Sequence, residues 1–228
     1  MPRKETGEWV HLDPLSERGF VQANAWQATF GLSHDIETLA RLMGGNDSLA
    51  TQLNYVFEMS KNARFLSSYV SYANQPGCSN AHVFSHVGKP WLTQYWVRQI
   101  VERLYNATER GYPGDEDQGG MSSWYILSSL GIYAVCPGTD EYVIGSPLFK
   151  KATITMENGN KFVIEANNNS KENLYIQSAT LNGRVLDKNF IRYDDIADGG
   201  IIRFEMGSQP NKERCTSKYA APFSLSKE

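Results

Sequence analysis

The sequence predicts an α+β fold, in which a helical part is followed by an antiparallel β region. Apolar residues recur at helical spacing up to about residue 135 and alternate with polar residues beyond it. Two Asn-Gly pairs, Asn158-Gly159 and Asn182-Gly183, fall in the second part and are typical of tight hairpin turns. With 41% hydrophobic residues in a chain of 228, a core can form without disulfides. The expected domains are a helical part (1–138), an antiparallel β region (139–207) and a polar tail (208–228).

Four helices are expected in the first part, because apolar side chains repeat on one face of each. The first opens at Ser33, whose hydroxyl suits an N-cap, and closes at the glycine pair Gly44-Gly45. The loops over 71–92 and 106–120 are long and rich in Gly, Pro, Asn and Ser, and such loops on helical scaffolds often carry function. The expected helices are 33–44, 47–59, 93–105 and 121–131.

The β region contains short alternating segments separated by turn residues. The clearest is a hairpin centred on Asn158-Gly159, and a second tight turn is expected at Asn182-Gly183. Beyond Ser208 the tail is polar and should be weakly ordered, although 219–223 has apolar residues that can dock. The expected strands are 153–156, 161–164, 174–176 and 201–206, and the segment 179–185 is expected to fold back around Asn182-Gly183.

Charge and composition argue against several function classes. The net charge is −3 and the 22 Lys and Arg residues are scattered, whereas nucleic-acid binding needs a basic patch or stripe. No run of about eighteen apolar residues is present, so we expect no membrane span, and the opening residues MPRKETGEW carry no apolar export signal. The three cysteines are too few for a disulfide framework and lack the CxxC spacing of zinc sites.

The densest candidate for chemistry is a run of three acids, Asp115-Glu116-Asp117, between glycines and directly before the expected helix at 121–131. A carboxylate at a helix N-terminus is favoured by the helix dipole, so the segment can be a helix cap. A cap needs only one acid, however, and in an extended turn Asp115 and Asp117 project to one side while Glu116 points away. Two carboxylates facing one cavity can hold a water or a cation. Both interpretations stay open from these residues alone.

A second candidate is the polar stretch around Trp26. The amides of Gln22, Asn24 and Gln27 offer donors and acceptors for sugar hydroxyls, and Trp26 can stack on a sugar face. By itself, however, the stretch is more typical of a polar helix edge with a core tryptophan. A third stretch, 73–76, reads by spacing alone as a loop.

Taken together, the three stretches resemble glycoside hydrolase family 92, the calcium-dependent exo-acting α-mannosidases. The family pattern Glu-Gly-Asn-x-Trp-Gln is similar to Gln22-Ala23-Asn24-Ala25-Trp26-Gln27, and its later Pro-His-Asp is similar to Ser33-His34-Asp35. Its Gly-Asn-Glu-Pro is similar to Ala73-Asn74-Gln75-Pro76. The pattern Gly-(Asp/Asn)-(Glu/Asp)-Asp-x-Gly-Gln-Met-Ser-(Ala/Ser)-Trp-Tyr is similar to the residues from Gly114 to Tyr125. The likeness covers roughly residues 10–205.

The resemblance implies a fold and a context. Family members are inverting glycosidases built on an (α/α)6 barrel with a β-sandwich domain before it, and they are secreted or periplasmic. The chain is then expected to be the C-terminal part, a helical half-barrel followed by the β region. Half a barrel exposes apolar helix faces. We therefore expect it to form a homodimer or to associate with the missing N-terminal region, and to be inactive or nearly so alone.

The resemblance also implies roles for individual residues. The family's catalytic base lies in the Gly-Asp-Glu-Asp segment, which makes Asp115 and Asp117 the candidates for water activation. A Ca²⁺ ion binds sugar hydroxyls and helps to distort the ring, with Asp117 and Gln75 as expected ligands. The expected partner is a mannose-containing glycan or a mannosyl phosphate, bound by the side chains of Asn24, Trp26, Gln27, His34, Asp35 and Asn74.

Departures from the family pattern change the expected substrate. Gln22 stands where the family has its general acid, and an amide cannot donate a proton at neutral pH. A sugar alkoxide would then leave slowly, whereas a phosphate leaving group needs no protonation and meets no negative charge at Gln22. Gln75 and Cys78-Ser79 likewise replace a Glu and a His-His pair of the family. These changes favour mannosyl phosphodiesters as substrates, with an inactive sugar-binding or structural homologue as the alternative.

Overall fold

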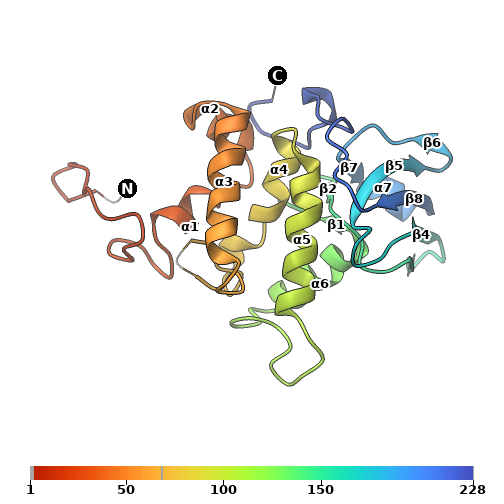
Figure 1. The fold of residues 1–228 in the computed structure, drawn as a ribbon, viewed down its shortest axis with the longest axis horizontal. Coiled ribbons are helices and arrows are strands. Elements are labelled where there is room, and N and C mark those ends of the chain that lie inside the picture. Colours follow the sequence, from red (N-terminus) through yellow and green to blue (C-terminus); the bar gives the residue numbers. More distant parts are fainter. Residues whose placement is uncertain (1–2, 68, 228) are drawn as a thin grey trace.

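The first part of the chain is helical and the second is built of strands, as the change of period predicts (Figure 1). The computed structural model describes residues 3–67 and 69–227, and it confirms the α+β fold class. Within these described residues, no helix has the length and apolar character needed to cross a membrane. The helices of the first part are α1 (Ala25–Thr29), α2 (Ile36–Leu42), α3 (Asn46–Ser60), α4 (Val83–His86), α5 (Pro90–Leu104) and α6 (Gly120–Leu130).

All four expected helices are confirmed within a few residues, as α2, α3, α5 and α6. Helix α5 begins earlier than expected, at Pro90, because proline suits the first helical turn. The expected N-cap at Ser33 is wrong. Helix α2 begins at Ile36, and the Asp35 carboxylate caps it by accepting the N–H of Thr38 at 3.3 Å. The short helices α1 and α4 lack the length at which a periodic pattern becomes visible.

Aromatic rings hold the helices together. Helices α3 and α5 lie side by side (Figure 1), and Trp96 of α5 stacks on Phe57 of α3 with ring centroids 5.0 Å apart. The Trp96 indole N–H donates to Asn54 Oδ1 at 2.9 Å, so its polar atom is satisfied in the core. Trp124 of α6 is also fully buried and donates to the Cys78 carbonyl at 2.7 Å. Burying one such side chain contributes about 1.5–3 kcal/mol, and the Trp124 bond fixes α6 against the loop that contains Cys78.

The strands form two separate sheets, a division that the sequence pattern does not predict. The smaller sheet is antiparallel with the order β1-β2-β7, and the larger has the order β3-β4-β8-β5-β6. The short helix α7 (Tyr193–Ala197) follows β7. The strands are β1 (Ile132–Tyr133), β2 (Glu141–Ile144), β3 (Lys151–Thr155), β4 (Lys161–Asn167), β5 (Tyr175–Leu181), β6 (Arg184–Val185), β7 (Phe190–Arg192) and β8 (Gly200–Gly207).

Both expected hairpins are confirmed in the larger sheet. Strand β3 pairs with β4 around Asn158-Gly159, and β5 pairs with β6 around Asn182-Gly183. Gly159 and Gly183 have φ +85° and +80°, the left-handed conformation that such turns need. One pair departs from the antiparallel expectation, since β8 runs parallel to β4. The segment between them, which contains β5 to β7 and α7, provides the long connection that parallel strands require.

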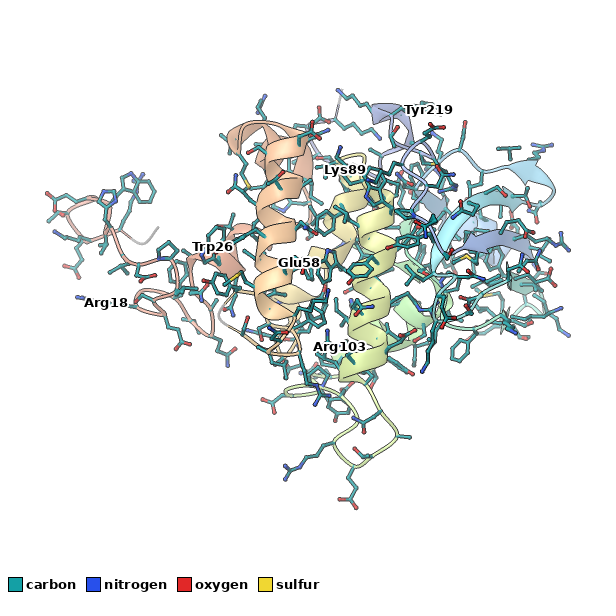
Figure 2. All side chains as sticks on the ribbon, viewed as in Figure 1. Arg18, Trp26, Glu58, Lys89, Arg103 and Tyr219 are labelled. Atoms are coloured by element: carbon teal, nitrogen blue, oxygen red, sulfur yellow. The ribbon has the colours of Figure 1, made fainter. Side chains whose placement is uncertain are left out.

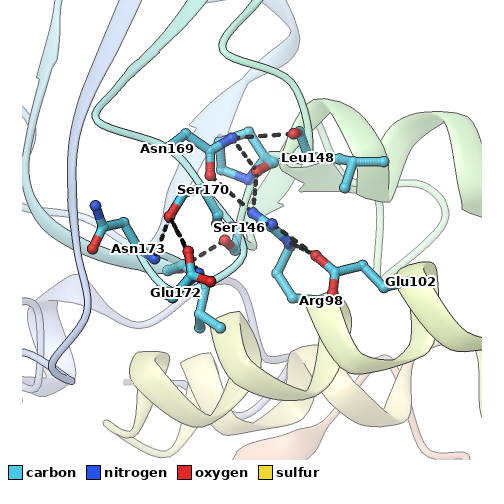
Figure 3. A network of polar contacts seen from close by, with 10 residues as sticks. Arg98, Glu102, Ser146, Leu148, Asn169, Ser170, Glu172 and Asn173 are labelled. Carbon is cyan, nitrogen blue, oxygen red and sulfur yellow. Dashed lines mark hydrogen bonds and ion pairs between the residues drawn. The ribbon is translucent and has the colours of Figure 1, made fainter.

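Arg98 joins the helical part to the β part (Figure 3). Its buried guanidinium donates to the Glu102 carboxylate at 2.8 Å on the same helix. Across the joint it donates to the Pro147 carbonyl at 2.8 Å and to Asn169 Oδ1 at 2.9 Å. The Ser170 carbonyl accepts a further bond at 3.1 Å. A buried charge must be paired in this way, so the network fixes the loops after β2 and β4 against α5.

Replacing Arg98 should therefore damage stability strongly. Arg98→Met leaves the Glu102 carboxylate, Asn169 Oδ1 and the Ser170 carbonyl without their donor, and we expect the free energy of unfolding to fall by about 3–5 kcal/mol. Arg203→Met is the matched control, because Arg203 is half-exposed and pairs with Glu165 at 2.9 Å. Its expected loss is at most about 1 kcal/mol. Urea unfolding of both variants measures the difference, and equal losses would contradict the role of Arg98 in the joint.

The C-terminal tail packs on α2, whereas the polar composition predicts a weakly ordered segment. The Ser224 hydroxyl donates to the Asp35 carboxylate at 2.9 Å, and the Leu225 N–H donates to the His34 carbonyl at 2.9 Å. The expected docking of 219–223 is confirmed, since Ala220 is buried and its carbonyl accepts a backbone hydrogen bond. The tail thereby closes the helical part from the far end of the chain, a contact that local sequence patterns cannot reveal.

Candidate active site

Three separate loops meet at one hollow on the helical part of the chain. The hollow has a volume of about 330 Å³. Its walls come from the segment before α1, from the loop that leads into the short helix η1 (Gln75–Gly77), and from the loop before α6. The lining residues are Gln22, Ser71, Ala73, Asn74, Asp115 and Asp117. The structure thus brings together residues from all three stretches that the sequence marks as candidates.

Gly114 lets two of these loops touch. A Cβ atom at this position would overlap the carbonyl oxygen of Ala73, and the residue has φ +66°. Only glycine meets both conditions, so the acidic loop lies directly on the turn at Ala73 and Asn74. Asn74 ties this turn to the third loop, because its Nδ2 donates to the Gln22 carbonyl at 3.2 Å.

Replacing Gly114 should cost more than its backbone conformation alone. We expect Gly114→Ala to lower the free energy of unfolding by about 2–4 kcal/mol, because left-handed strain adds to the overlap with Ala73. Gly159→Ala is the matched control, since Gly159 has φ +85° and nothing within 4 Å of an added Cβ. The free energy of unfolding of Gly159→Ala should fall by only about 1–2 kcal/mol. Thermal unfolding compares the stability of the two variants. If Gly114→Ala lost no more stability than Gly159→Ala, the acidic loop would not be in close contact with the turn at Ala73.

The three consecutive acids divide into one helix cap and two hollow-lining side chains. The Glu116 carboxylate accepts the N–H of Ser122 at 3.2 Å and also that of Gly119, at the start of α6. Hydrogen bonds from Ser122 and Gly119 hold the pKa of Glu116 below its usual value. Asp115 and Asp117 line the hollow instead. The alternation along the run predicts this division. The helix-cap interpretation is confirmed for Glu116, whereas Asp115 and Asp117 lie on one hollow, as the other interpretation requires.

Three of the eight non-glycine residues with positive φ in the described part of the chain lie in the loops at this hollow. Asp117 and Gln118 have φ +52° and +57°, directly before the left-handed Gly119, and Gln22 has φ +53°. Residues other than glycine rarely adopt positive φ, at a cost of roughly 1–3 kcal/mol each, and they cluster at functional sites. Gln22 and Asp117 both line the hollow. Two of its wall positions are therefore held in conformations that an ordinary loop would avoid.

Two other residues of the polar stretch around Trp26 make contacts that stabilise the helical part of the fold. Asn24 is buried and caps α1, with its Oδ1 accepting the N–H of Gln27 at 3.1 Å. Trp26 lies beside α3 (Figure 2), with its ring 6.4 Å from Phe30 and 6.1 Å from Tyr55. Neither Asn24 nor Trp26 lines the hollow. The geometry of this tryptophan fits the core interpretation that its sequence context favours.

Gln27 borders the hollow, whereas His34 and Asp35 lie elsewhere. Gln27 lines a smaller recess that shares wall residues with the hollow, and its Nε2 donates to the Ser67 carbonyl at 2.9 Å. Asp35 caps α2, and hydrogen bonds from the tail, that of Ser226 above all, hold its pKa well below its usual value. His34 is exposed at the start of the same helix. Among the predicted substrate-binding residues, the structure thus brings only Asn74 to the wall, with Gln27 next to it.

Ser71 is a wall residue that the sequence patterns do not mark, and Ala73 lies in the third candidate stretch without a predicted role. Both residues come shortly before the Pro76-Gly77 pair. A Cβ on Gly77 would overlap the Ser71 carbonyl oxygen. The chain therefore folds tightly back over Ser71 at this point. The Pro-Gly pair is the one signal in the sequence that such a turn exists, but it does not say which residues the turn exposes.

Comparison with known proteins identifies the family. A model of the glycosyl hydrolase family 92 catalytic domain matches residues 1–208. The chain belongs to glycosyl hydrolase family 92.

Family 92 relatives share the fold closely. A solved inverting mannosidase of this family from Bacteroides thetaiotaomicron is 35% identical with a TM-score of 0.89, over 97% of this chain and 33% of that one. A family 92 α-mannosidase from the same organism is 32% identical with a TM-score of 0.90, over 98% and 30%. An uncharacterized secreted glycosidase from Arthroderma benhamiae is 27% identical over 224 residues, 91% of this chain and 28% of the relative. The chain thus spans about a third of the length of these relatives.

The hollow is lined by the types of oxygen atom that bind a calcium ion. Ca²⁺ prefers carboxylate and amide oxygens, and Asp115, Asp117 and Asn74 supply both types. Gln75 does not line the hollow. Its Nε2 lies at Gly120 and is buried without a hydrogen-bond partner among the described residues. Nowhere in 3–67 or 69–227 do three His, Cys, Asp or Glu side chains gather to hold a metal. Because Ca²⁺ takes about six to eight oxygens, the described residues supply only part of a ligand set.

Proposed function

We propose that this chain carries the water-activating side of an active site that hydrolyses α-mannosides with inversion. The observation that supports it most directly is that Gln22, at the family's general-acid position, lines one hollow together with Asp115 and Asp117. An inverting glycosidase needs a group that assists the leaving oxygen and a carboxylate that activates water across the sugar ring. The solved relatives are an inverting mannosidase and an α-mannosidase, which supports mannose as the sugar.

Hydrolysis in this arrangement is a single displacement. Asp115 or Asp117 accepts a proton from a water molecule, whose oxygen forms a bond to the anomeric carbon of mannose. The bond from that carbon to the leaving oxygen breaks, its electron pair departs with the leaving group, and the anomeric configuration inverts. Asn74 holds the Gln22 segment beside the acidic loop through its 3.2 Å hydrogen bond. The bond supports the relative placement of the two sides of the site.

Gln22 selects the leaving group. An amide cannot protonate a departing sugar alkoxide, and general acid catalysis is worth about 10²–10⁴-fold in rate. A phosphate leaves without being protonated, and a neutral Gln22 does not repel its negative charge. The substrate proposed here is therefore a mannosyl phosphodiester in preference to an unmodified mannose-containing glycan.

Calcium is part of the proposal, with Asp117 and the other oxygen donors of the hollow, Asp115 and Asn74, as the residues that would hold it. Gln75, the second expected ligand, does not line the hollow. The ion, when bound, supplies positive charge that binds sugar hydroxyls and favours a distorted ring. We also propose that the chain alone is inactive or nearly so, because it spans only about a third of its solved relatives.

Rates on two substrates test the proposal in the full-length protein. Hydrolysis of an α-mannosyl phosphodiester should be about 10²–10⁴-fold faster than that of α-1,2-mannobiose, and a calcium chelator should abolish both. Gln22→Glu should raise the rate on mannobiose and lower it on the phosphodiester, through charge repulsion. Gln209→Glu adds the same charge at an exposed position outside the hollow and should leave both rates unchanged.

Two outcomes would count against parts of this proposal. A wild-type rate on mannobiose equal to or above that on the phosphodiester would remove the assigned role of Gln22. Sugar binding without any turnover, in the wild type and in Gln22→Glu alike, would favour the alternative of a sugar-binding or structural module.

A further inference from the structure

A small recess adjoins the hollow of the candidate active site. It shares three wall residues with the hollow, Gln22, Ser71 and Asn74, so the two spaces lie next to each other. The volume of the recess is about 10 Å³, which is about the space that one water molecule needs. A sugar ring or a phosphate group is much too large for it. The recess is therefore of a size to bind a single water molecule.

Asn80 adds a buried amide to the wall of this recess. It begins the short helix η2 (Asn80–His82) and is only 1% exposed. Its Oδ1 has no hydrogen-bond partner among the described residues. Burying an acceptor without a partner is costly, and an apolar side chain of similar size would avoid that cost. A water molecule in the recess is a partner that removes the cost.

The fold holds Asn80 at the recess. The N–H of the next residue, Ala81, donates to the hydroxyl of the fully buried Tyr72 at 3.1 Å. The turn before η2 is also tight, because a Cβ on Gly77 would overlap the Ser71 carbonyl oxygen. Exposing the Asn80 amide to bulk water would require this packing to open.

Ser71 and Gln22 complete a set of partners for one water molecule. Ser71 Oγ accepts the N–H of Ala73 at 3.3 Å, so its own hydroxyl proton can be donated into the recess. The side chain of Gln22 offers Oε1 as an acceptor. A buried water typically makes about three hydrogen bonds. The hydroxyl of Ser71, Asn80 Oδ1 and Gln22 Oε1 provide that number.

We propose that a water molecule bound in this recess makes Asn80 a positioning residue for Gln22. The water accepts the Ser71 hydroxyl proton and donates to Asn80 Oδ1 and to Gln22 Oε1. Asn74 already holds the Gln22 backbone through its carbonyl at 3.2 Å, so the water fixes the remaining freedom, which is that of the side chain.

The orientation of the Gln22 amide decides what it offers to the leaving group. An amide presents either an acceptor oxygen or a donor NH₂ group. With Oε1 held by the water, Nε2 is the end that faces the hollow. It donates to the leaving phosphate oxygen, whose negative charge grows as the bond to the anomeric carbon breaks. The inference rests on the proposed function for the nature of this leaving group.

Kinetics of the full-length protein on an α-mannosyl phosphodiester tests the positioning role. Asn80→Leu removes the acceptor with little change in side-chain size. We expect kcat to fall by about tenfold with KM unchanged, because the bond from Gln22 strengthens only as charge develops on the leaving oxygen. In a Gln22→Ala background, Asn80→Leu should lower kcat no further, since Asn80 acts through Gln22.

Ser128→Ala is the matched control. It also removes a buried polar atom that has no partner among the described residues, but Ser128 lines neither the hollow nor the recess. Both kcat and KM should stay at their wild-type values. Melting curves check the fold of each variant, and Asn80→Ala replaces Asn80→Leu in the kinetic comparison if leucine prevents folding.

A crystal structure of the full-length protein, at a resolution that shows ordered water, tests the binding site without a variant. One water should lie within hydrogen-bond distance of Asn80 Oδ1 and Gln22 Oε1. A recess without this water, or equal effects of the Asn80 substitution with and without Gln22, would overturn the inference. If the water is present and no α-mannoside is hydrolysed, the proposed function fails and the water site stands. Hydrolysis that the Asn80 substitution does not slow would overturn the positioning role and leave the proposed function intact.

Discussion

Changing Asp115 and Asp117 together to asparagine should slow the hydrolysis of α-mannosides by the full-length protein by about 10²–10⁴-fold. Both side chains line the hollow that contains Gln22, and an amide in place of each carboxylate cannot accept a proton from water. Glu116 cannot replace them, because its carboxylate already accepts N–H groups at the start of α6. Initial rates on a mannosyl phosphodiester measure the effect, and the single variants show which aspartate is the base.

Asp194→Asn/Asp198→Asn is the matched control for this experiment. Asp194 and Asp198 are exposed and lie at α7, outside the hollow. Their substitutions remove the same amount of charge as the Asp115 and Asp117 substitutions. The control should retain the wild-type rate. If the Asp115 and Asp117 double variant retained it as well, the hollow would not be the place where water is activated.

Acidification should destabilise the chain partly through His82. This residue is fully buried, with its ring 4.9 Å from that of Tyr133, and burial lowers its pKa to about 3. A histidine in the unfolded chain has a pKa near 6.5, so between about pH 6.5 and 3 only the unfolded state binds this proton. Stability therefore falls as the pH falls through that window, by about 1.4 kcal/mol per pH unit. His86, whose pKa burial lowers to about 4, acts in the same direction.

Urea unfolding at pH 7 and pH 5 measures this contribution. His82→Phe keeps an aromatic ring beside Tyr133 and removes the titrating group, so its loss of stability between the two pH values should be smaller than that of the wild type by about 2 kcal/mol. His34→Phe changes an exposed histidine and should follow the wild type. Identical pH dependence in His82→Phe and the wild type would mean that His82 is not held neutral by burial.

Local sequence patterns predict the elements of this fold better than their connections. The turns at Asn158-Gly159 and Asn182-Gly183 are confirmed, because two adjacent residues set the backbone of each. The parallel pairing of β4 with β8 is not visible locally, since it depends on where a distant strand inserts. Asp35 is a similar case. Its residue type suits a cap, but its contact with Ser224 forms only when the tail returns to α2.

The candidate site, like the fold, is predicted from the sequence only where neighbouring residues determine the structure. Alternation along Asp115-Glu116-Asp117 predicts which acid faces away, and the structure places Glu116 on the helix accordingly. Local patterns do not predict that Gln22 lies in one hollow with these aspartates. The family resemblance implies it, and the absence of a Cβ at Gly114 allows the acidic loop to contact the turn at Ala73. Trp26 carries a sugar-binding residue type, and its half-buried ring packs with Phe30 and Tyr55 outside the hollow, which its motif does not reveal.

The central claim is that water, activated by Asp115 or Asp117, attacks the anomeric carbon from the face opposite the leaving group. Proton NMR of the mannose first released from an α-mannosyl phosphodiester by the full-length protein tests it most directly. The account predicts that β-mannose is released first and mutarotates to the equilibrium mixture only later. Initial release of α-mannose would contradict it, because it would require either retention at the anomeric carbon or cleavage of the bond between phosphorus and oxygen.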